Sequence, residues 1–349
     1  MADTTIIIPT HERPQYLRRI VDFLSPSDNE ILVVDSSPES CRNILPSNVR
    51  YFHKPDLYLT QKILFASKEI HTSYAAICAD DDFLTVSGIE QASQFLSENP
   101  HYACAQGLTM TYIVPDQKTV CFFPKYQHLA LARLQINPES SDPKIRLTSA
   151  FCPFLQWIYA VHRVDALRQT SEILCAIENP PRCFTDRVFS FGLAISGNLK
   201  LLPILFSVRE HAPMSVPANE KFCVLRKSAN PAIQTEFQML TQHLHHQWDE
   251  RIGDAPAIEW LESLFDLYCR SIEPENSPKS PERGSLEQVQ INHKEKSIVR
   301  CFSPAIRQYG GGNEHDIATL RLVSEAVLGN FTSGLLVESK FPGQINFDF

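Results

Sequence analysis

Three consecutive aspartates, Asp80-Asp81-Asp82, are the residues of this 349-residue chain whose type and spacing point most directly to chemistry. Adjacent carboxylates repel one another unless a cation compensates them. On an extended backbone side chains alternate, so Asp80 and Asp82 would point the same way and share one ion, while Asp81 points away. Hard oxygen ligands favour Mg²⁺ or Mn²⁺ over zinc. The alternative is a solvated acidic loop that caps a helix starting near Thr85.

The elements that would position these aspartates are apolar segments with the pattern of buried strands. One such segment ends just before Asp80, and two earlier ones end at Thr10 and Asp35, with helical patterns between them. This alternation predicts a doubly wound, mostly parallel α/β sheet. In such sheets ligands bind beyond the carboxyl ends of the strands. Thr10, Asp35 and the three aspartates are therefore expected to share one site.

The alternation of strands and helices continues and then stops. The next expected elements are an amphipathic helix and the two strands of a hairpin, at residues 86–96, 103–113 and 119–123. From residue 226 onward the patterns are helical. We therefore predict a catalytic domain over residues 1–225 and a mainly helical C-terminal extension over residues 226–349. A stretch rich in Pro, Ser and charge predicts a flexible linker around residues 273–292.

The composition narrows the class of protein. Hydrophobic residues make up 43% and charged residues 21%, as in globular proteins, and the net charge of -8 disfavours a nucleic-acid partner. The ten cysteines form no C-x-x-C pair, which fits reduced thiols in a cytoplasmic protein. No secretory pattern opens the sequence. The longest nearly apolar stretch, residues 150–161, falls short of the roughly 20 residues of a membrane span. Peripheral contact with the inner face of a membrane stays open.

Three motifs resemble, in the same order, those of inverting glycosyltransferases of family 2, which have the GT-A fold. They are the Ile-Ile-Ile-Pro-Thr run ending at Thr10, the strand ending at Asp35, and the Asp80-Asp81-Asp82 segment. The resemblance covers residues 4–110. It implies a metal-dependent hexosyltransferase-type enzyme that moves a sugar from a nucleoside-diphosphate sugar, with a UDP-sugar favoured, to a glycan or lipid-linked acceptor hydroxyl. In one departure, Ser36-Ser37-Pro38 follows Asp35 where the family usually has an acidic residue and Gly-Ser.

The resemblance also implies roles for the first half of the site. Thr10, Glu12 and Asp35 would line the nucleotide pocket, Asp80 would lie near the ribose, and Asp82 would hold a metal that bridges the diphosphate. Two cationic side chains are added from their positions, because Arg13 and Lys62 could reach a phosphate; the alternative is that both are solvated. The expected nucleotide-sugar site thus comprises Thr10, Glu12, Arg13, Asp35, Lys62, Asp80 and Asp81.

The second half of the site comes from two later segments. Asp186 matches the catalytic acid that the family keeps at the start of a helix, here after a capping Thr185, and would act as general base. The alternative is a first-turn acid favoured by the helix dipole. His211 lies in the stretch where many GT-A enzymes place a final metal ligand. It would complete the ligand set with Asp82 and Asp80. A lone histidine is also a common surface or core residue.

Two other functions compete with glycosyl transfer. Nucleotidyltransferases that make activated sugars use a similar sheet and paired aspartates, but this chain lacks a Gly-rich, Arg/Lys-bearing loop after its first strand. A non-catalytic module that binds nucleotide-sugars or glycans would fit if Asp186 were buried away from the acceptor.

Overall fold

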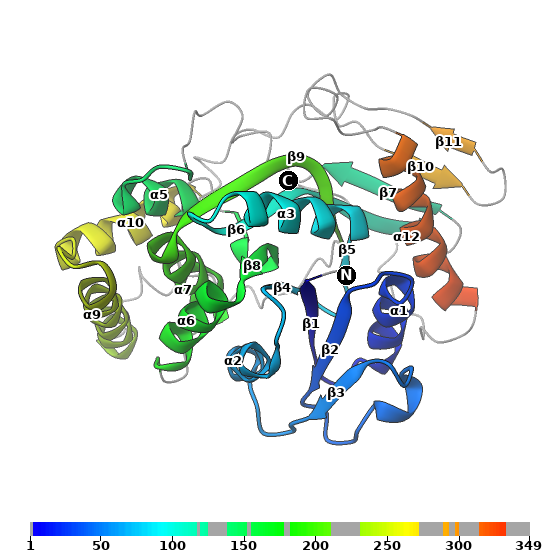
Figure 1. Ribbon diagram of the computed structural model, residues 1–349, viewed down its shortest axis with the longest axis horizontal. Helices are drawn as coiled ribbons and strands as arrows, with labels where there is room; N and C mark the ends of the chain where they lie inside the picture. Colours follow the sequence, from blue (N-terminus) through cyan, green and yellow to red (C-terminus); the bar gives the residue numbers. More distant parts are fainter. Residues whose placement is uncertain are drawn as a thin grey trace.

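A computed structural model of the chain describes residues 3–116, 119–124, 138–151, 155–177, 182–210, 231–271, 289–292, 297–299 and 314–332. The fold is α/β, with one mixed sheet and helices on both of its faces (Figure 1). The described strands are β1 Thr4–Thr10, β2 Glu30–Asp35, β3 Arg50–His53, β4 Tyr74–Ile77, β5 Phe83–Leu84, β6 Tyr102–Asp116, β7 Thr119–Pro124, β8 Val161–Arg163, β9 Asn198–Glu210, β10 Val289–Asn292 and β11 Ser297–Val299.

Helices alternate with these strands as the sequence predicts through residue 98. The described helices are α1 Pro14–Leu24, α2 Leu59–Glu69, α3 Val86–Glu98, α5 Pro143–Phe151, α6 Val164–Cys175, α7 Arg182–Ser196, α9 Pro231–Ile252, α10 Ile258–Ser271 and α12 Glu314–Thr332, with 3₁₀ turns η1 Arg42–Ile44 and η2 Trp157–Tyr159. No helix within the described ranges is both long and apolar enough to cross a membrane.

The sheet is parallel where it carries the strand ends of interest. Its main path runs β11-β10-β7-β6-β8-β4-β1-β2-β3, and β9 pairs with β6 and β5. The pairs β2–β3, β1–β2, β1–β4 and β6–β9 are parallel, whereas the other pairs are antiparallel. The carboxyl ends of β1, β2 and β4 therefore meet at one edge, as parallel order requires. The predicted α/β fold, with parallel strands and helices in alternation over its first part, is confirmed.

Strand β1 shows why this part of the sheet is buried on both faces. Ile6 and Ile8 pack in one hydrophobic cluster and Ile7 in the other, and all three are fully buried. Burying each such side chain stabilises the fold by roughly 1.5–3 kcal/mol. Helix α1 covers one face because Pro14 begins it and its apolar residues recur at helical spacing. The apolar side chains on one face of β1 and those on the apolar face of α1 thus belong to the same hydrophobic cluster.

The C-terminal region packs on the sheet domain at two separate places. Helices α9 and α10 lie beside α5 and α7, whereas α12 lies beside α1 at the other end of the molecule (Figure 1). Trp248 of α9 and Phe265 of α10 belong to the same cluster as Ile7. The region is mainly helical as predicted, but β10 and β11 add two strands to β7.

Part of the predicted domain organisation lies outside the described residues. The proposed boundary near residue 225 falls within 211–230, and most of the predicted linker falls within 272–288. Within the linker prediction, Val289–Asn292 is a strand of the sheet. The pairing of that strand with β7 on one side and β11 on the other explains the difference, because alternating apolar and polar residues suit a strand of a sheet.

Candidate active site

The site forms where β1, β2 and β4 end. Thr10, the last residue of β1, donates its hydroxyl proton to Asp80 Oδ2 at 2.7 Å. The backbone N–H of Ser36 donates to the Thr10 carbonyl at 3.1 Å, which joins the ends of β1 and β2. Thr10, Asp35 and Asp80 are all buried. The expectation that these strand ends converge is confirmed.

Asp35 is held as an ordered carboxylate. Its Oδ1 accepts from the Ser37 backbone N–H at 2.8 Å and from the Ser37 hydroxyl at 2.5 Å, and its Oδ2 accepts from the Tyr51 hydroxyl at 2.6 Å. Burial acts to raise the pKa of Asp35, but these hydrogen bonds outweigh it, so the pKa lies below its ordinary value. Ser37, at the departure from the family pattern, thus supports the aspartate.

The loop after β1 is fixed through its backbone. Glu12 has φ 52°, a left-handed conformation that side chains other than glycine seldom adopt. Its backbone N–H donates to the Ser37 hydroxyl at 2.8 Å, and its side chain is 63% exposed. The neighbouring His11 ring lies 3.0 Å from the Ser36 carbonyl through Nδ1. Glu12 is therefore held by its main chain beside the expected nucleotide pocket, and its exposed carboxylate lies 3.8 Å from His11 Nε2.

Lys62 is buried between the same two strand ends. Its ammonium donates to the Thr10 carbonyl at 2.7 Å and to the Ser36 hydroxyl at 2.9 Å. Burial lowers its pKa, although the charges of Asp80 and Asp35 act in the opposite direction. Two hydrogen bonds thus fix the Lys62 amine within the site. The alternative of a solvated Lys62 is wrong, because its side chain comes from α2 inward and not outward.

The three aspartates lie in a turn, so the expected alternation along an extended backbone is wrong. The N–H of Asp82 donates to the Ala79 carbonyl at 3.2 Å, which bends the chain directly after β4. Asp80 and Asp81 consequently face one guanidinium, since Arg13 Nη1 lies 3.1 Å from Asp80 Oδ1 and 2.7 Å from Asp81 Oδ2. Arg13 is thus ion-paired with both aspartates although its side chain is 49% exposed. The Thr85 hydroxyl accepts from an N–H of α3 and caps it.

Asp82 faces a different cation. Its Oδ2 accepts from Arg209 Nε of β9 at 2.6 Å, and its Oδ1 accepts from the Glu210 N–H at 3.3 Å. Burial raises the pKa of Asp82 to about 6, although the Arg209 charge acts to lower it. Arg209 also donates to the Tyr159 hydroxyl at 3.2 Å, and its guanidinium lies over the Tyr159 ring at 4.2 Å. Two arginines thus compensate the carboxylates for which the sequence argument invoked only a metal.

A third arginine, Arg19, binds the backbone of the aspartate turn. Arg19 of α1 is buried between the rings of Tyr16 and Phe83, at 4.8 and 4.9 Å. Its Nη2 donates to the Asp81 carbonyl at 2.8 Å and lies 3.8 Å from Glu210. The guanidinium therefore connects α1, the aspartate turn and the end of β9. The amphipathic pattern of α1 gave no sign of this role, because Arg19 lies between apolar positions.

Asp186 lies in α7, close to Arg209. Its Oδ2 accepts from Gln156 Nε2 at 3.2 Å, and Arg187 Nη1 lies 3.9 Å from the same oxygen. Helix α7 begins at Arg182, so Thr185 is a buried residue within the helix and the prediction that it caps the helix is wrong. Asp186 is consequently not a first-turn acid. Its side chain is partly buried, with 26% of its surface exposed.

The donor set offers oxygen ligands but no complete metal cage. In the described part of the chain, no group of three or more His, Cys, Asp and Glu is arranged to hold an ion. Mg²⁺ needs fewer, because it is usually bound by one or two carboxylates together with water and substrate phosphates. Asp80 and Asp82 supply two carboxylates, which face Arg13 and Arg209 respectively. The third predicted ligand, His211, lies outside the described residues.

Two residues that no sequence motif singles out, Gln156 and Arg209, join the two halves of the site. Arg209 binds Asp82 and also donates to Gln156 Oε1. Gln156 in turn donates to Asp186, so a continuous chain of contacts links Asp82 to Asp186. The available signal was Gln156 itself, a polar residue within the apolar stretch of residues 150–161. Its neighbour Trp157 is fully buried in the core.

Comparison with known proteins gives one sequence match and several similar folds. Residues 5–138 match the profile of glycosyl transferase family 2. Among curated proteins no relative matches the chain. A similar solved structure is S. aureus TarS 1-349, at 14% identity and TM-score 0.48, with 80% of this chain and 75% of that chain covered. Its complex with UDP has 14% identity and TM-score 0.47, covering 95% and 91%. Its complex with UDP-GlcNAc has 14% identity and TM-score 0.45, covering 86% and 99%.

Proposed function

We propose, from the premise that residues 5–138 are a glycosyl transferase family 2 segment, that this protein is a metal-dependent inverting glycosyltransferase. It moves a sugar from a nucleoside-diphosphate sugar, with UDP as the favoured nucleotide, to an acceptor hydroxyl. The acceptor class is a glycan or a lipid-linked molecule, so the reaction belongs to glycan or polysaccharide synthesis. Each of these finer assignments goes beyond the family match.

One observation supports this proposal above the others. Carboxylates at the strand ends and the carboxylate of the candidate base are linked by one network of side-chain contacts. Asp80 and Asp82 are buried at the edge where parallel strands end, beside the cations Arg13 and Arg209. Asp186 is reached from Asp82 through Arg209 and Gln156. A charged donor and an acceptor hydroxyl need such neighbouring but distinct groups, one set for the diphosphate and one for the proton.

In the proposed reaction the acceptor oxygen attacks the anomeric carbon while the bond from that carbon to the diphosphate oxygen breaks. The acceptor hydroxyl proton goes to Asp186, which acts as general base. The configuration at the anomeric carbon inverts because attack and departure occur on opposite faces. Lys62 and Arg13 hold positive charge at the strand ends where the nucleotide would lie. Their fixed positions favour the negative leaving group without reorganisation.

Metal dependence is part of the proposal. Asp82, with Asp80, would hold Mn²⁺ or Mg²⁺, and the bound ion would supply positive charge to the leaving diphosphate. His211 is proposed as a further ligand. Burial raises the pKa of Asp82, and a bound cation would favour its charged form as Arg209 does.

The test is a screen of nucleoside diphosphates by thermal unfolding, with Mn²⁺, with Mg²⁺ and with EDTA. A ligand that binds only the folded state raises the apparent stability, by about 2.7 kcal/mol at a hundred times its Kd. We expect UDP to stabilise the protein in the presence of metal and not in EDTA. Full stabilisation in EDTA would remove metal dependence from the proposal, and no stabilisation by any nucleoside diphosphate would remove the donor site.

A turnover assay separates this function from its competitors. Incubation with UDP-sugars and candidate acceptors should release UDP and form a glycoside. Release of pyrophosphate from a nucleoside triphosphate and a sugar phosphate would instead indicate a nucleotidyltransferase. Nucleotide binding with no turnover on any acceptor would indicate a binding module.

A further inference from the structure

In the contact between Gln156 and Asp186, the donor and the acceptor can be assigned from the chemistry of the neighbouring Arg209. A guanidinium has only donors, so the amide atom of Gln156 that faces Arg209 must be its oxygen. The other amide atom, Nε2, therefore faces Asp186 and donates to Oδ2 at 3.2 Å. Within this chain of contacts Asp186 can only accept. A carboxylate in the accepting form is what proton removal from a hydroxyl requires.

Arg209 is held in place by more than Gln156. Asp82 accepts from its Nε, Tyr159 accepts from its Nη2, and the Tyr159 ring lies beneath the guanidinium. Although burial acts to lower the pKa of Arg209, the Asp82 charge holds it above its ordinary value, so the group is a permanent cation. Gln156 Oε1 thus meets a fixed donor, and the amide plane is set by it.

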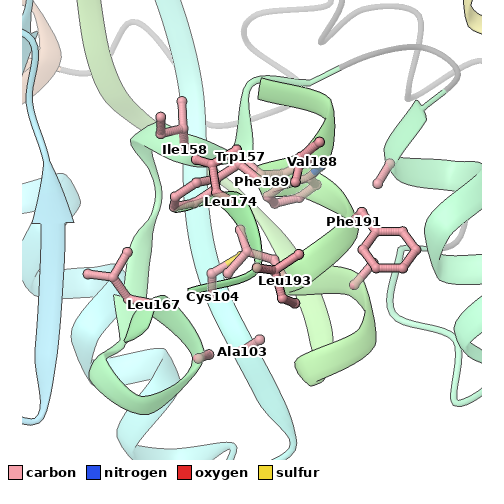
Figure 2. Close-up of a cluster of buried hydrophobic side chains, with 14 of the residues drawn as sticks. Ala103, Cys104, Trp157, Ile158, Leu167, Leu174, Val188, Phe189, Phe191 and Leu193 are labelled. Atoms are coloured by element: carbon pink, nitrogen blue, oxygen red, sulfur yellow. The ribbon is translucent and has the colours of Figure 1, made fainter. Parts of the chain in front are cut away.

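The backbone under Gln156 and Asp186 is equally fixed. Figure 2 shows Trp157 and Ile158, which follow Gln156, gathered with Val188 and Phe189, which follow Asp186, in one hydrophobic cluster. All four side chains are buried. Because interiors of this kind are close-packed, neither element can shift without disturbing the other. The distance between the amide and the carboxylate is therefore set by the core.

Both contacts of the Asp186 carboxylate involve Oδ2. Gln156 Nε2 donates to this oxygen, and Arg187 Nη1 lies 3.9 Å from it. Among the described residues Oδ1 has no such contact. One oxygen thus orients the group and the other remains to receive a proton.

We propose that Gln156 is a positioning residue for Asp186, and that Arg209 anchors it and so couples the orientation of Asp186 to Asp82. This inference rests on the proposed function, because it assigns a role to Gln156 only if Asp186 takes the acceptor proton. Gln156 itself exchanges no proton. Its effect is to hold one carboxylate oxygen, so that the second faces the acceptor. The sequence separations involved, 30 residues to Asp186 and 53 to Arg209, place the three groups on different elements.

The test is Gln156→Glu, which changes one end of the amide only. A carboxylate at this position still accepts from Arg209 but can no longer donate to Asp186. We expect kcat to fall about 10- to 100-fold, since small misplacement of a reacting group costs about 10²-fold. The KM for the donor and the nucleotide-induced thermal stabilisation should remain within about twofold of wild type. Gln91→Glu, on the exposed face of α3, makes the same charge change away from the site and should leave kcat unchanged.

The combined variant with Asp186→Asn distinguishes positioning from general support of the structure. Residues that act through one another give non-additive losses. The double variant should therefore be no slower than Asp186→Asn alone. If Gln156→Glu unfolds the protein, Gln156→Leu removes the same donor without adding charge, and the same two comparisons apply.

Two results would overturn the inference. One is a wild-type kcat in both Gln156 variants while Asp186→Asn is impaired, and the other is a loss that multiplies with that of Asp186→Asn. A different result, full turnover in Asp186→Asn, would instead refute the base assignment on which the proposed function depends. The two failures are therefore distinguishable.

Discussion

The two halves of the site are built differently. The strand-end cluster, Thr10, Asp35, Lys62 and Asp80, comes from the first βαβα segment, and its contacts follow from three parallel strands ending at one edge. The base-side cluster, Gln156, Asp186 and Arg209, comes from three elements that no local pattern connects. Asp82 is close in sequence to the strand-end cluster, but its carboxylate is paired with Arg209 of the base-side cluster. The positions of the binding residues therefore follow from the topology of the sheet, whereas the position of the candidate base depends on side-chain contacts.

The largest expected effect is on the base side. Asp186→Asn removes the proton acceptor but keeps the shape and an oxygen for Gln156, so kcat should fall by about 10² to 10⁴. Nucleotide binding should be retained, because Asp186 has no described contact with the strand-end cluster. Asp165→Asn, an exposed residue of α6, is the matched control. Steady-state turnover and nucleotide thermal shifts measure both quantities, and equal losses in both would contradict the separation of the two halves.

The next effect concerns the aspartate that joins the halves. Asp82→Asn removes a buried charge that faces Arg209, and nucleoside-diphosphate affinity with metal should fall about 10- to 100-fold, the scale of 1.5–3 kcal/mol for charged hydrogen bonds. Asp81→Asn should cost less, because Asp81 is partly exposed and faces Arg13. Titration calorimetry measures both. A larger loss for Asp81→Asn would show that the wrong aspartate has been assigned to the diphosphate.

How much of this site follows from sequence can be judged from particular residues. Apolar periodicity is local, so it correctly predicted the strands and helices through α3 and the convergence of Thr10, Asp35 and Asp80. The orientation within the aspartate triplet could not be predicted, because it depends on a turn closed by the Asp82 N–H. The capping role of Thr185 was wrong for a related reason, since α7 begins three residues earlier.

The base-side contacts could not be predicted from sequence. The Arg209 guanidinium reaches Asp82 across 127 residues and Gln156 across 53, and neither spacing has a sequence signature. The register of β9 against β6 and β5 decides where Arg209 points. That register is a property of the assembled sheet.

A smaller effect, on stability, tests the strand that carries Arg209. A Cβ on Gly107 of β6 would lie 2.4 Å from the Ile204 carbonyl oxygen and 2.9 Å from Phe206 Cβ, both on β9. Gly107→Ala should therefore lower the free energy of unfolding by about 3 kcal/mol, at the upper end for overpacking. Gly253→Ala, with open space but φ 75°, should cost about 1 kcal/mol. Urea unfolding compares them, and an equal cost would mean that β9 yields easily.

The smallest expected effect concerns Asp35. Tyr51→Phe removes the 2.6 Å hydrogen bond to its Oδ2 and should lower the free energy of unfolding by about 1–2 kcal/mol at pH 7. The pKa of Asp35 is below its ordinary value, so the stability it contributes is present above pH 3.8 and is lost as the pH falls through the folded-state pKa. The difference between the two proteins should narrow below about pH 4. A difference independent of pH would show that the Tyr51 hydroxyl stabilises the fold through the hydrogen bonds it accepts from Cys41 N–H and the Ser40 hydroxyl, and not through Asp35.

The central claim is that one bound nucleotide-sugar lies across both halves of the site. A structure of the protein with UDP and Mn²⁺ tests this claim most directly. We expect the diphosphate at the Asp80-Asp81-Asp82 turn, beside Arg13 and Arg209. The Asp186 carboxylate should then lie within about 6 Å of the place where an acceptor hydroxyl meets the anomeric carbon, the reach of a hydrogen bond made directly or through one water. A diphosphate bound elsewhere, or an Asp186 carboxylate beyond that reach, would contradict the account.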